Sequence, residues 1–136
     1  MESNLDRLKK AYADWNGSRG ASRDAWAALM GDHFQLRHVD ETSQGLGFAR
    51  DSATREEAMR YLAAIFIDWE MVHYTPEHYV CEGDRIAMFG RSAFRNRGTG
   101  KVADLRMACL WEFSGDRAVS LTEIVDSAVA VAAATP

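Results

Sequence analysis

The sequence predicts an α+β domain in which a cone-shaped, curved antiparallel sheet is covered on its concave face by three helices that enclose a pocket. Segments with helical periodicity fill the first half of the 136-residue chain, and alternating segments separated by turns fill the second half. The third observation is residues 101–113, in which every second side chain is apolar. This face consists of Ala103, Leu105, Met107, Cys109, Trp111 and Phe113. Such a face requires a cover, which the helices of the first half can provide.

Two helices are predicted before the first strand. Residues 3–16 carry an apolar side chain at every third or fourth position, which is typical of a helix with one buried face. These residues are Leu5, Leu8, Tyr12 and Trp15. Ser22 is placed to cap a second, shorter helix, and Gly31 is placed to end it. Residues 33–39 then predict a strand that directs Phe34, Leu36 and His38 to one face.

A polar loop at residues 40–52, with Phe48 as its one large apolar residue, precedes the strongest helical pattern of the chain. Thr54 and Glu57 have the spacing of a capping box, and the predicted helix runs from 54 to 72. Its apolar stripe is Ala58, Leu62, Ile65, Trp69 and Val72. Pro76 bars its continuation.

Four alternating segments complete the predicted sheet, at residues 77–82, 85–96, 101–113 and 117–126. Turns rich in glycine separate the last three of them. The alanine- and valine-rich tail from Ser127 can form one or two helical turns. No internal repeat, linker or second-domain signal interrupts the pattern, so a single domain is expected over residues 1–136.

Composition narrows the classes of partner. Apolar residues make up 47% and charged residues 26% of the chain, as in ordinary globular proteins. The net charge of −4 argues against nucleic acid, which requires a basic surface. No apolar run approaches the ~20 residues that span a bilayer, and no secretory signal is present, so a cytoplasmic protein without membrane contact is expected. Cys81 and Cys109 match no metal-binding or redox spacing, and neither a metal nor another cofactor is expected.

Four short segments carry a resemblance to a known family. They are Thr99-Gly100-Lys101, Leu110-Trp111-Glu112-Phe113, Gly115-Asp116-Arg117-Ala118-Val119 and Asp126-Ser127-Ala128. This pattern resembles the nuclear transport factor 2-like superfamily, in particular its SnoaL-like branch, together with ketosteroid isomerases, limonene epoxide hydrolases and polyketide cyclases. By element order the resemblance covers nearly the whole chain. It implies the cone fold, but not one activity, because this scaffold serves enzymes and non-enzymes.

The resemblance implies a mixed set of site residues. His38 falls where the isomerases carry an aspartate base, and Tyr12 falls near their oxyanion-binding tyrosine. Cys109 occupies the position of their protonated acid, so that donor is missing. Asp126 matches the final-strand aspartate of the epoxide hydrolases. Their Arg-x-Asp motif is replaced by Arg91-Ser92-Ala93, which lacks the aspartate.

His38, Asp126 and Tyr12 are therefore the candidate catalytic residues, each with a structural alternative. His38 shares a face with apolar residues and needs a buried partner, for which Tyr12, Trp15 and Asp126 are candidates; it can equally be a core histidine. Asp126 can cap the tail helix instead. Glu123 points inward unless a bulge reverses it. The expected pocket lining is Trp15, Phe34, Leu36, Met107, Cys109 and Trp111.

Two function classes follow from these candidates. The first is a cofactor-free acid–base enzyme acting on a hydrophobic cyclic small molecule by isomerisation, dehydration, cyclisation or hydrolysis, with His38 moving the proton. The second is a non-catalytic domain that binds a small molecule or serves in association, favoured by the incomplete catalytic set. A homodimer through the outer sheet face is expected, since Phe89, Ala108 and Leu110 give that face apolar surface.

Overall fold

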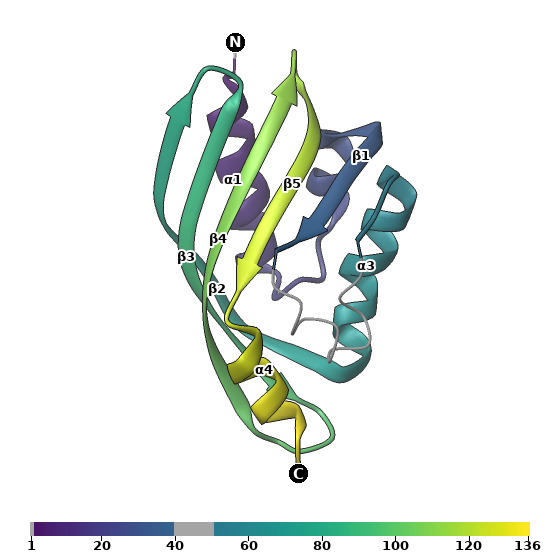
Figure 1. Ribbon diagram of the computed structural model, residues 1–136, viewed down its shortest axis with the longest axis vertical. Coiled ribbons are helices and arrows are strands. Elements are labelled where there is room, and N and C mark those ends of the chain that lie inside the picture. Colours follow the sequence, from purple (N-terminus) through teal and green to yellow (C-terminus); the bar gives the residue numbers. More distant parts are fainter. Residues whose placement is uncertain (1, 40–50) are drawn as a thin grey trace.

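The computed structural model describes residues 2–39 and 51–136. Its elements in chain order are α1 (Asn4–Gly17), α2 (Asp24–Leu29), β1 (Met30–His38), α3 (Arg55–Asp68), β2 (Trp69–Glu82), β3 (Arg85–Asn96), β4 (Val102–Ser114), β5 (Arg117–Val125) and α4 (Ser127–Ala134). Helices α1 and α3 lie on the same side of a curved sheet, and α4 lies at the end of the sheet near the C-terminus (Figure 1). The predicted α+β fold class is confirmed. The loop predicted around Phe48 lies outside the described residues over positions 40–50.

The five strands form one sheet in the order β1-β5-β4-β3-β2. Strands β2 to β5 pair antiparallel with their neighbours, as expected, whereas β1 pairs with β5 in parallel. Parallel neighbours require a long connection, and here everything from α3 to β4 lies between the two strands. This edge pair positions the candidate site, because its register places Leu36 opposite Leu121 and His38 opposite Glu123.

The prediction that the third helix extends to residue 72 is wrong. Helix α3 ends at Asp68, and Trp69 adopts extended backbone as the first residue of β2. The reason is tertiary: β2 pairs with β3 from Trp69 to Glu82, and that long ladder outweighs the helical pattern of the local sequence. Pro76 lies inside this edge strand beside a break in register, where a missing amide donor is tolerated.

The second helix also differs from the prediction at both ends. Its N-cap is Arg23, which makes no side-chain capping bond, so the prediction that Ser22 caps this helix is wrong. The backbone amide of Ser22 donates to Ser18 Oγ at 2.8 Å. The helix ends at Leu29, and Gly31 belongs to β1 rather than to a helix terminus. Parallel pairing with β5 begins at Met30, so Met30 and Gly31 are part of the sheet and not of the helix.

The inner face predicted for residues 101–113 is confirmed, and Trp111 is its centre. Trp111 stacks on Trp26 of α2 with ring centroids 5.4 Å apart and on Phe34 of β1 at 5.8 Å. Its indole Nε1 donates to the hydroxyl of Tyr12 on α1 at 2.9 Å. One side chain of β4 therefore joins two helices and the edge strand β1.

The predicted helical tail is confirmed as α4, which the β3–β4 hairpin holds at the end of the sheet. Thr99 Oγ1 donates to the carbonyl of Ala133 at 2.6 Å, and Lys101 Nζ donates to the carbonyl of Thr135 at 2.7 Å. These bonds satisfy carbonyls at the C-terminal end of the helix. No helix in the described part of the chain is long and apolar enough to cross a membrane.

Candidate functional site

A cavity of about 120 Å³ lies between the helices and the concave face of the sheet. Its described walls are mostly aromatic and aliphatic, with polar atoms contributed by a few side chains. The lining consists of Tyr12, Trp15, Trp26, Met30, Leu36, His38, Tyr61, Leu62, Ile65, Trp69, Tyr74, Ser92, Phe94, Leu105, Met107, Trp111, Leu121, Glu123, Val125 and Ala130. Such a wall is mostly apolar, which strengthens any electrostatic interaction inside the cavity.

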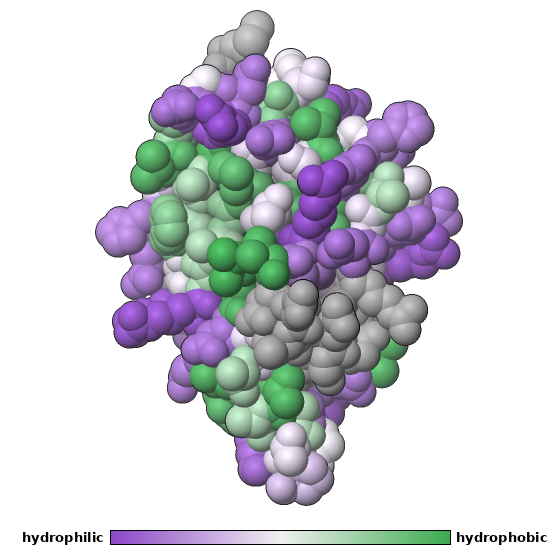
Figure 2. Space-filling model, in the orientation of Figure 1, coloured by the Kyte–Doolittle hydropathy of each residue, from purple (hydrophilic) through white to green (hydrophobic). Residues whose placement is uncertain are grey.

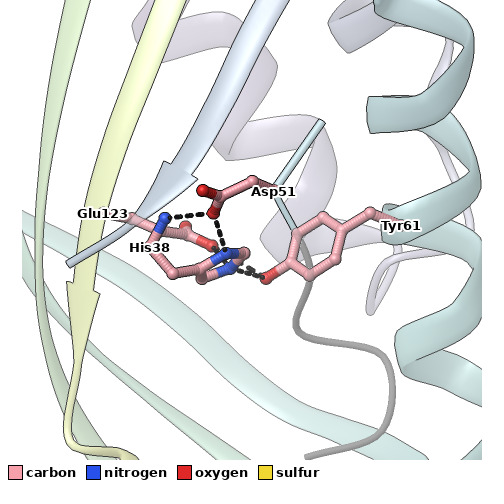
Figure 3. A network of polar contacts seen from close by, with 4 residues as sticks. All are labelled: His38, Asp51, Tyr61 and Glu123. Carbon is pink, nitrogen blue, oxygen red and sulfur yellow. Dashed lines mark hydrogen bonds and ion pairs between the residues drawn. The ribbon is translucent and has the colours of Figure 1, made fainter. Parts of the chain in front are cut away.

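The ion pair of His38 and Glu123 is the main polar feature of this wall (Figure 3). His38 is the last residue of β1, and the parallel register places it directly beside Glu123 of β5. Nε2 of His38 lies 2.8 Å from Oε1 of Glu123, and the two side chains are 5% and 15% exposed. Because a carboxylate can only accept, Nε2 carries the proton that joins them.

Tyr61 joins the pair from the opposite side of the cavity. It lies on α3, three residues after the buried Ala58, and therefore on the inner side of that helix. Its hydroxyl donates to Oε1 of Glu123 at 2.8 Å and lies 3.1 Å from Nε2 of His38. Oε1 thus accepts two hydrogen bonds, whereas no bond from the described residues reaches the second carboxylate oxygen of Glu123.

Asp51 holds the other side of the imidazole. Its Oδ1 accepts the backbone amide of His38 at 3.0 Å and lies 3.5 Å from Nδ1 of the same residue. Nδ1 is buried and has no hydrogen-bond partner within the described parts of the chain, so this contact is electrostatic. Asp51 itself is 65% exposed, and its charge is correspondingly screened. Two carboxylates of unequal burial therefore flank one histidine.

These surroundings set the protonation of the site. Burial is the largest single influence on His38 and acts to lower its pKa, but hydrogen bonds and charges from Glu123 and Asp51 together outweigh it and raise the pKa above 6.5. Burial, followed by the charge of Glu123, raises the pKa of Tyr61 well above 10. Tyr61 therefore remains a protonated donor at neutral pH.

The raised pKa of His38 predicts a specific response to substitution. Replacing Glu123 with glutamine removes the main partner of the imidazolium, so the pKa of His38 is expected to fall. The matched change Asp126→Asn is expected to leave it unaltered. Proton NMR titration of the His38 ring in the three proteins measures this directly. An equal fall in both variants would contradict the assignment of Glu123 as the partner.

The same pKa predicts how stability depends on pH. A group whose pKa is raised by folding stabilises the folded state below its unfolded pKa, here 6.5, and this contribution is lost as pH rises through the folded pKa. Wild type is therefore expected to lose part of its advantage over His38→Gln as the pH increases across that window. Urea unfolding of both proteins at pH values from about 5.5 to about 8.5, a window that includes the ordinary histidine pKa of about 6.5, measures the difference between their free energies of unfolding. A difference that stays constant or grows with pH would contradict it.

Asp126 lies elsewhere than expected. It is the N-cap of α4, where its side chain accepts the amide of Val129 at 3.5 Å, and it is exposed and outside the cavity lining. Glu123 takes the place beside His38 for which Asp126 was considered. On β5 the inward positions alternate through Leu121, Glu123 and Val125, and the strand ends before Asp126.

A bulge does not reverse Glu123. The register between β4 and β5 shifts between Glu112 and Phe113, on the side of Leu121 away from Glu123. Beyond that shift, Glu123 is paired with the buried Cys109 and Val125 with the buried Met107. The alternation in the sequence indicated an inward Glu123 but did not single it out as the partner of His38, whereas Tyr61 had only its helical spacing from Ala58 as a signal.

Tyr12 lies in the cavity wall, away from the His38–Glu123 pair. Its hydroxyl accepts from Trp111 and lies, with the hydroxyl of Tyr74, beside the thiol of Cys109. Burial, as the largest influence, raises the pKa of both tyrosines well above 10. No hydrogen bond between Tyr12 and His38 exists among the described residues. The partner expected for His38 on α1 is replaced by Tyr61 on α3.

The structure places four of the six expected lining residues at the cavity wall: Trp15, Leu36, Met107 and Trp111. Phe34 and Cys109 are buried but lie behind the wall, and Phe34 is covered by the ring of Trp111. No group of three or more potential metal ligands occurs in the described ranges.

The fold is the nuclear transport factor 2-like α+β cone. The family model of the SnoaL-like domain matches residues 8–121, so the chain belongs to the SnoaL-like family. No curated protein matches the sequence.

Several solved structures share the fold. A nuclear transport factor 2-like protein of unknown function from Burkholderia pseudomallei is 18% identical over the whole of both chains, with a TM-score of 0.86. A candidate SnoaL-like polyketide cyclase from Jannaschia sp. CCS1 is 17% identical, with a TM-score of 0.78 over 98% of this chain and 92% of the other. A hypothetical protein from Catenulispora acidiphila with a ketosteroid isomerase-like fold, solved in complex with trimethylamine, is 15% identical, with a TM-score of 0.69 over 89% and 85%. At these identities the likeness concerns the fold alone.

Proposed function

We propose that the cavity is the active site of a cofactor-free acid–base enzyme that removes a proton from a small hydrophobic cyclic molecule. The observation that carries the proposal is the state of Glu123. One carboxylate oxygen is held by His38 and Tyr61, while no bond from the described residues reaches the other, and the residue lines an otherwise apolar cavity. A carboxylate that is anchored at one oxygen keeps the lone pairs of its other oxygen available to a substrate proton.

The proposed chemistry is proton abstraction next to a carbonyl group. Glu123 takes the proton, the electron pair of the broken carbon–hydrogen bond forms a carbon–carbon double bond, and the π electrons of the carbonyl group move to its oxygen to give an enolate. Return of the proton from Glu123 to another carbon of a conjugated system is an isomerisation. Attack of the enolate carbon on a second carbonyl group of the molecule forms a carbon–carbon bond and an alkoxide, which takes the proton back from Glu123; this is a cyclisation. His38 remains protonated throughout and orients Glu123 through Nε2. In this proposal the base is Glu123, and not His38 as the sequence suggested.

The developing oxyanion needs a hydrogen-bond donor. Tyr12 and Tyr74 line the same cavity, and their raised pKa values keep both hydroxyls protonated. Because the Tyr12 oxygen already accepts a bond from Trp111, its own proton is polarised toward other acceptors. We assign the donor role to Tyr12, with Tyr74 beside it.

Deuterium exchange tests the proposed step without knowledge of the natural substrate. Cyclohexanone in buffered D₂O is expected to gain deuterium next to its carbonyl faster with the protein than with buffer alone, as followed by mass spectrometry. Heat-denatured protein at the same concentration is the control. If cyclohexanone binds but exchanges no faster than in the control, proton abstraction is excluded for this probe and the binding function remains.

A non-catalytic binding domain is the second candidate. The predominance of aromatic side chains in the wall favours it, since such a wall holds apolar molecules or small organic cations without any chemistry. The related fold from Catenulispora acidiphila holds trimethylamine. Titration with trimethylammonium chloride, followed by tryptophan fluorescence, tests whether the wall binds such a cation, and deuterium exchange decides between the two candidates.

We also propose that a second copy of the chain covers the outer face of the sheet. Phe89, Ala108 and Ile124 are aligned across β3, β4 and β5, and Leu110 lies next to this row. Phe89 and Ile124 are 47% and 48% exposed. Apolar residues gather over this side of the molecule in Figure 2. An isologous dimer buries such a patch against itself.

The proposed dimer predicts the effect of a charge in its centre. Leu110→Arg is expected to halve the mass measured by light scattering, because each interface would bury two unpaired arginines. Ile67→Arg, which places the same charge on the exposed surface of α3, away from the outer face of the sheet, is the matched control and is expected to leave the mass unchanged. A wild-type protein with the mass of one chain would overturn the proposal.

A further inference from the structure

We propose that the cavity selects substrates with a single carbon ring and one polar group, and that Trp69 and Ala130 set this size limit. The inference rests on the proposed function of the cavity and narrows its substrate class. It is carried by the cavity volume, by the contacts of the tryptophans and by the position of α4.

The volume is the first argument. Pockets that take drug-sized ligands measure roughly 300–1,000 Å³, and this cavity measures about 120 Å³. An apolar cavity of ~150 Å³ accommodates a benzene ring. The space is therefore close to that of a single six-membered ring, and fused two-ring or larger molecules exceed it.

The polarity of the wall is the second argument. His38, Tyr61 and Glu123 form one polar cluster, whereas most of the remaining lining is aromatic or aliphatic. A ligand group that must be hydrogen-bonded is stable only where partners exist, and an unpaired polar group against the apolar wall costs free energy. The expected ligand thus has one polar group that accepts a hydrogen bond from Tyr12 or Tyr74, a neighbouring C–H bond directed at Glu123 and an apolar ring against the tryptophans.

All four tryptophans of the chain line the cavity. Trp15, Trp26 and Trp111 are fixed by contacts with other rings, so they are part of the core as well as the wall. Trp69 is buried at the start of β2, and no ring contact joins it to another described residue. It is therefore the tryptophan that can be made smaller with the least damage to the core.

Ala130 limits the cavity from the side of α4. It is 4% exposed, and the helix that carries it is fastened to the β3–β4 hairpin by the bonds of Thr99 and Lys101. Because α4 is held in place, a longer side chain at position 130 has to enter the cavity rather than displace the helix. Val129, the preceding residue, is 36% exposed and absent from the lining.

Binding of cyclohexanone and of 1-decalone tests the size limit, because the two ketones differ by one fused ring. Isothermal titration is expected to show that wild type binds cyclohexanone at least about 10-fold more tightly, although the larger ketone is more hydrophobic. Trp69→Leu is expected to tighten 1-decalone binding by about 10-fold or more. Ala130→Leu is expected to weaken cyclohexanone binding by about 10-fold, and the control Val129→Leu to leave it unchanged.

Each result bears on the inference separately from catalysis. Equal or tighter binding of 1-decalone by wild type, or no binding of either ketone, would overturn the size limit. An unchanged preference in Trp69→Leu, or in the more conservative Trp69→Phe should the leucine variant fail to fold, would overturn the role of Trp69. Selective binding of cyclohexanone without deuterium exchange would support the size limit while removing the proposed proton abstraction.

Discussion

Glu123→Gln is expected to reduce the catalysed exchange of cyclohexanone by about 10²- to 10⁴-fold, the range attributed to a positioned acid or base. Glutamine keeps the size of the side chain and an oxygen that accepts hydrogen bonds from His38 and Tyr61. It lacks the charge and the basic lone pairs that accept a proton. The loss is therefore expected in the rate of exchange, with binding of the ketone changed much less.

Two further variants separate this role from alternatives. Asp126→Asn is expected to retain exchange, because Asp126 caps α4 outside the cavity. His38→Gln is expected to lose less activity than Glu123→Gln and to shift the pH profile, since His38 positions the base rather than accepting the substrate proton. Full activity in Glu123→Gln together with loss in Asp126→Asn would transfer the catalytic role to the residue first suggested by family resemblance.

The largest effect on stability is expected from Trp111→Ala, at about 3–5 kcal/mol of unfolding free energy. Trp111 contacts Trp26 and Phe34 by stacking and Tyr12 through its indole N–H. Its removal leaves a void that is bordered by α1, α2 and β1. Since domains are stable by only ~5–15 kcal/mol, a substantial fraction of the total is at stake.

Urea unfolding of matched variants checks this prediction. Ile67→Ala shortens an exposed side chain on α3, which is 73% exposed, and is expected to cost about 1 kcal/mol or less. Trp111→Phe keeps a stacking ring but loses the bond to Tyr12, and is expected to fall between the two. A cost for Trp111→Ala no greater than that of Ile67→Ala would contradict the central role of this side chain.

Local patterns identified most of the fold. The alternation of residues 101–113 correctly predicted the buried face of β4, because neighbouring side chains of a strand point to opposite sides whatever the partner strand is. Helix α1 was equally readable from its apolar spacing. The errors occurred at Trp69 and at Gly31, where local patterns were outweighed by pairing with distant strands.

Local patterns predicted one residue of the candidate site but not its partner. His38 could be recognised as an inward polar residue on an otherwise apolar strand face, and its position in the structure agrees with that interpretation. Its partner could not be selected among the acidic residues near the C-terminus. Family resemblance favoured Asp126, whereas alternation along β5 favoured Glu123.

The sequence by itself determined the order of helices and strands, the inward face of β4 and the inward direction of His38, since each depends on periodicity within one segment. Only the tertiary structure decided that β1 pairs with β5 in parallel and that His38 therefore meets Glu123. It also brought Tyr61 of α3 to the same carboxylate oxygen. Register between distant segments arises from the packing of the whole sheet and its helices, and no single segment encodes it.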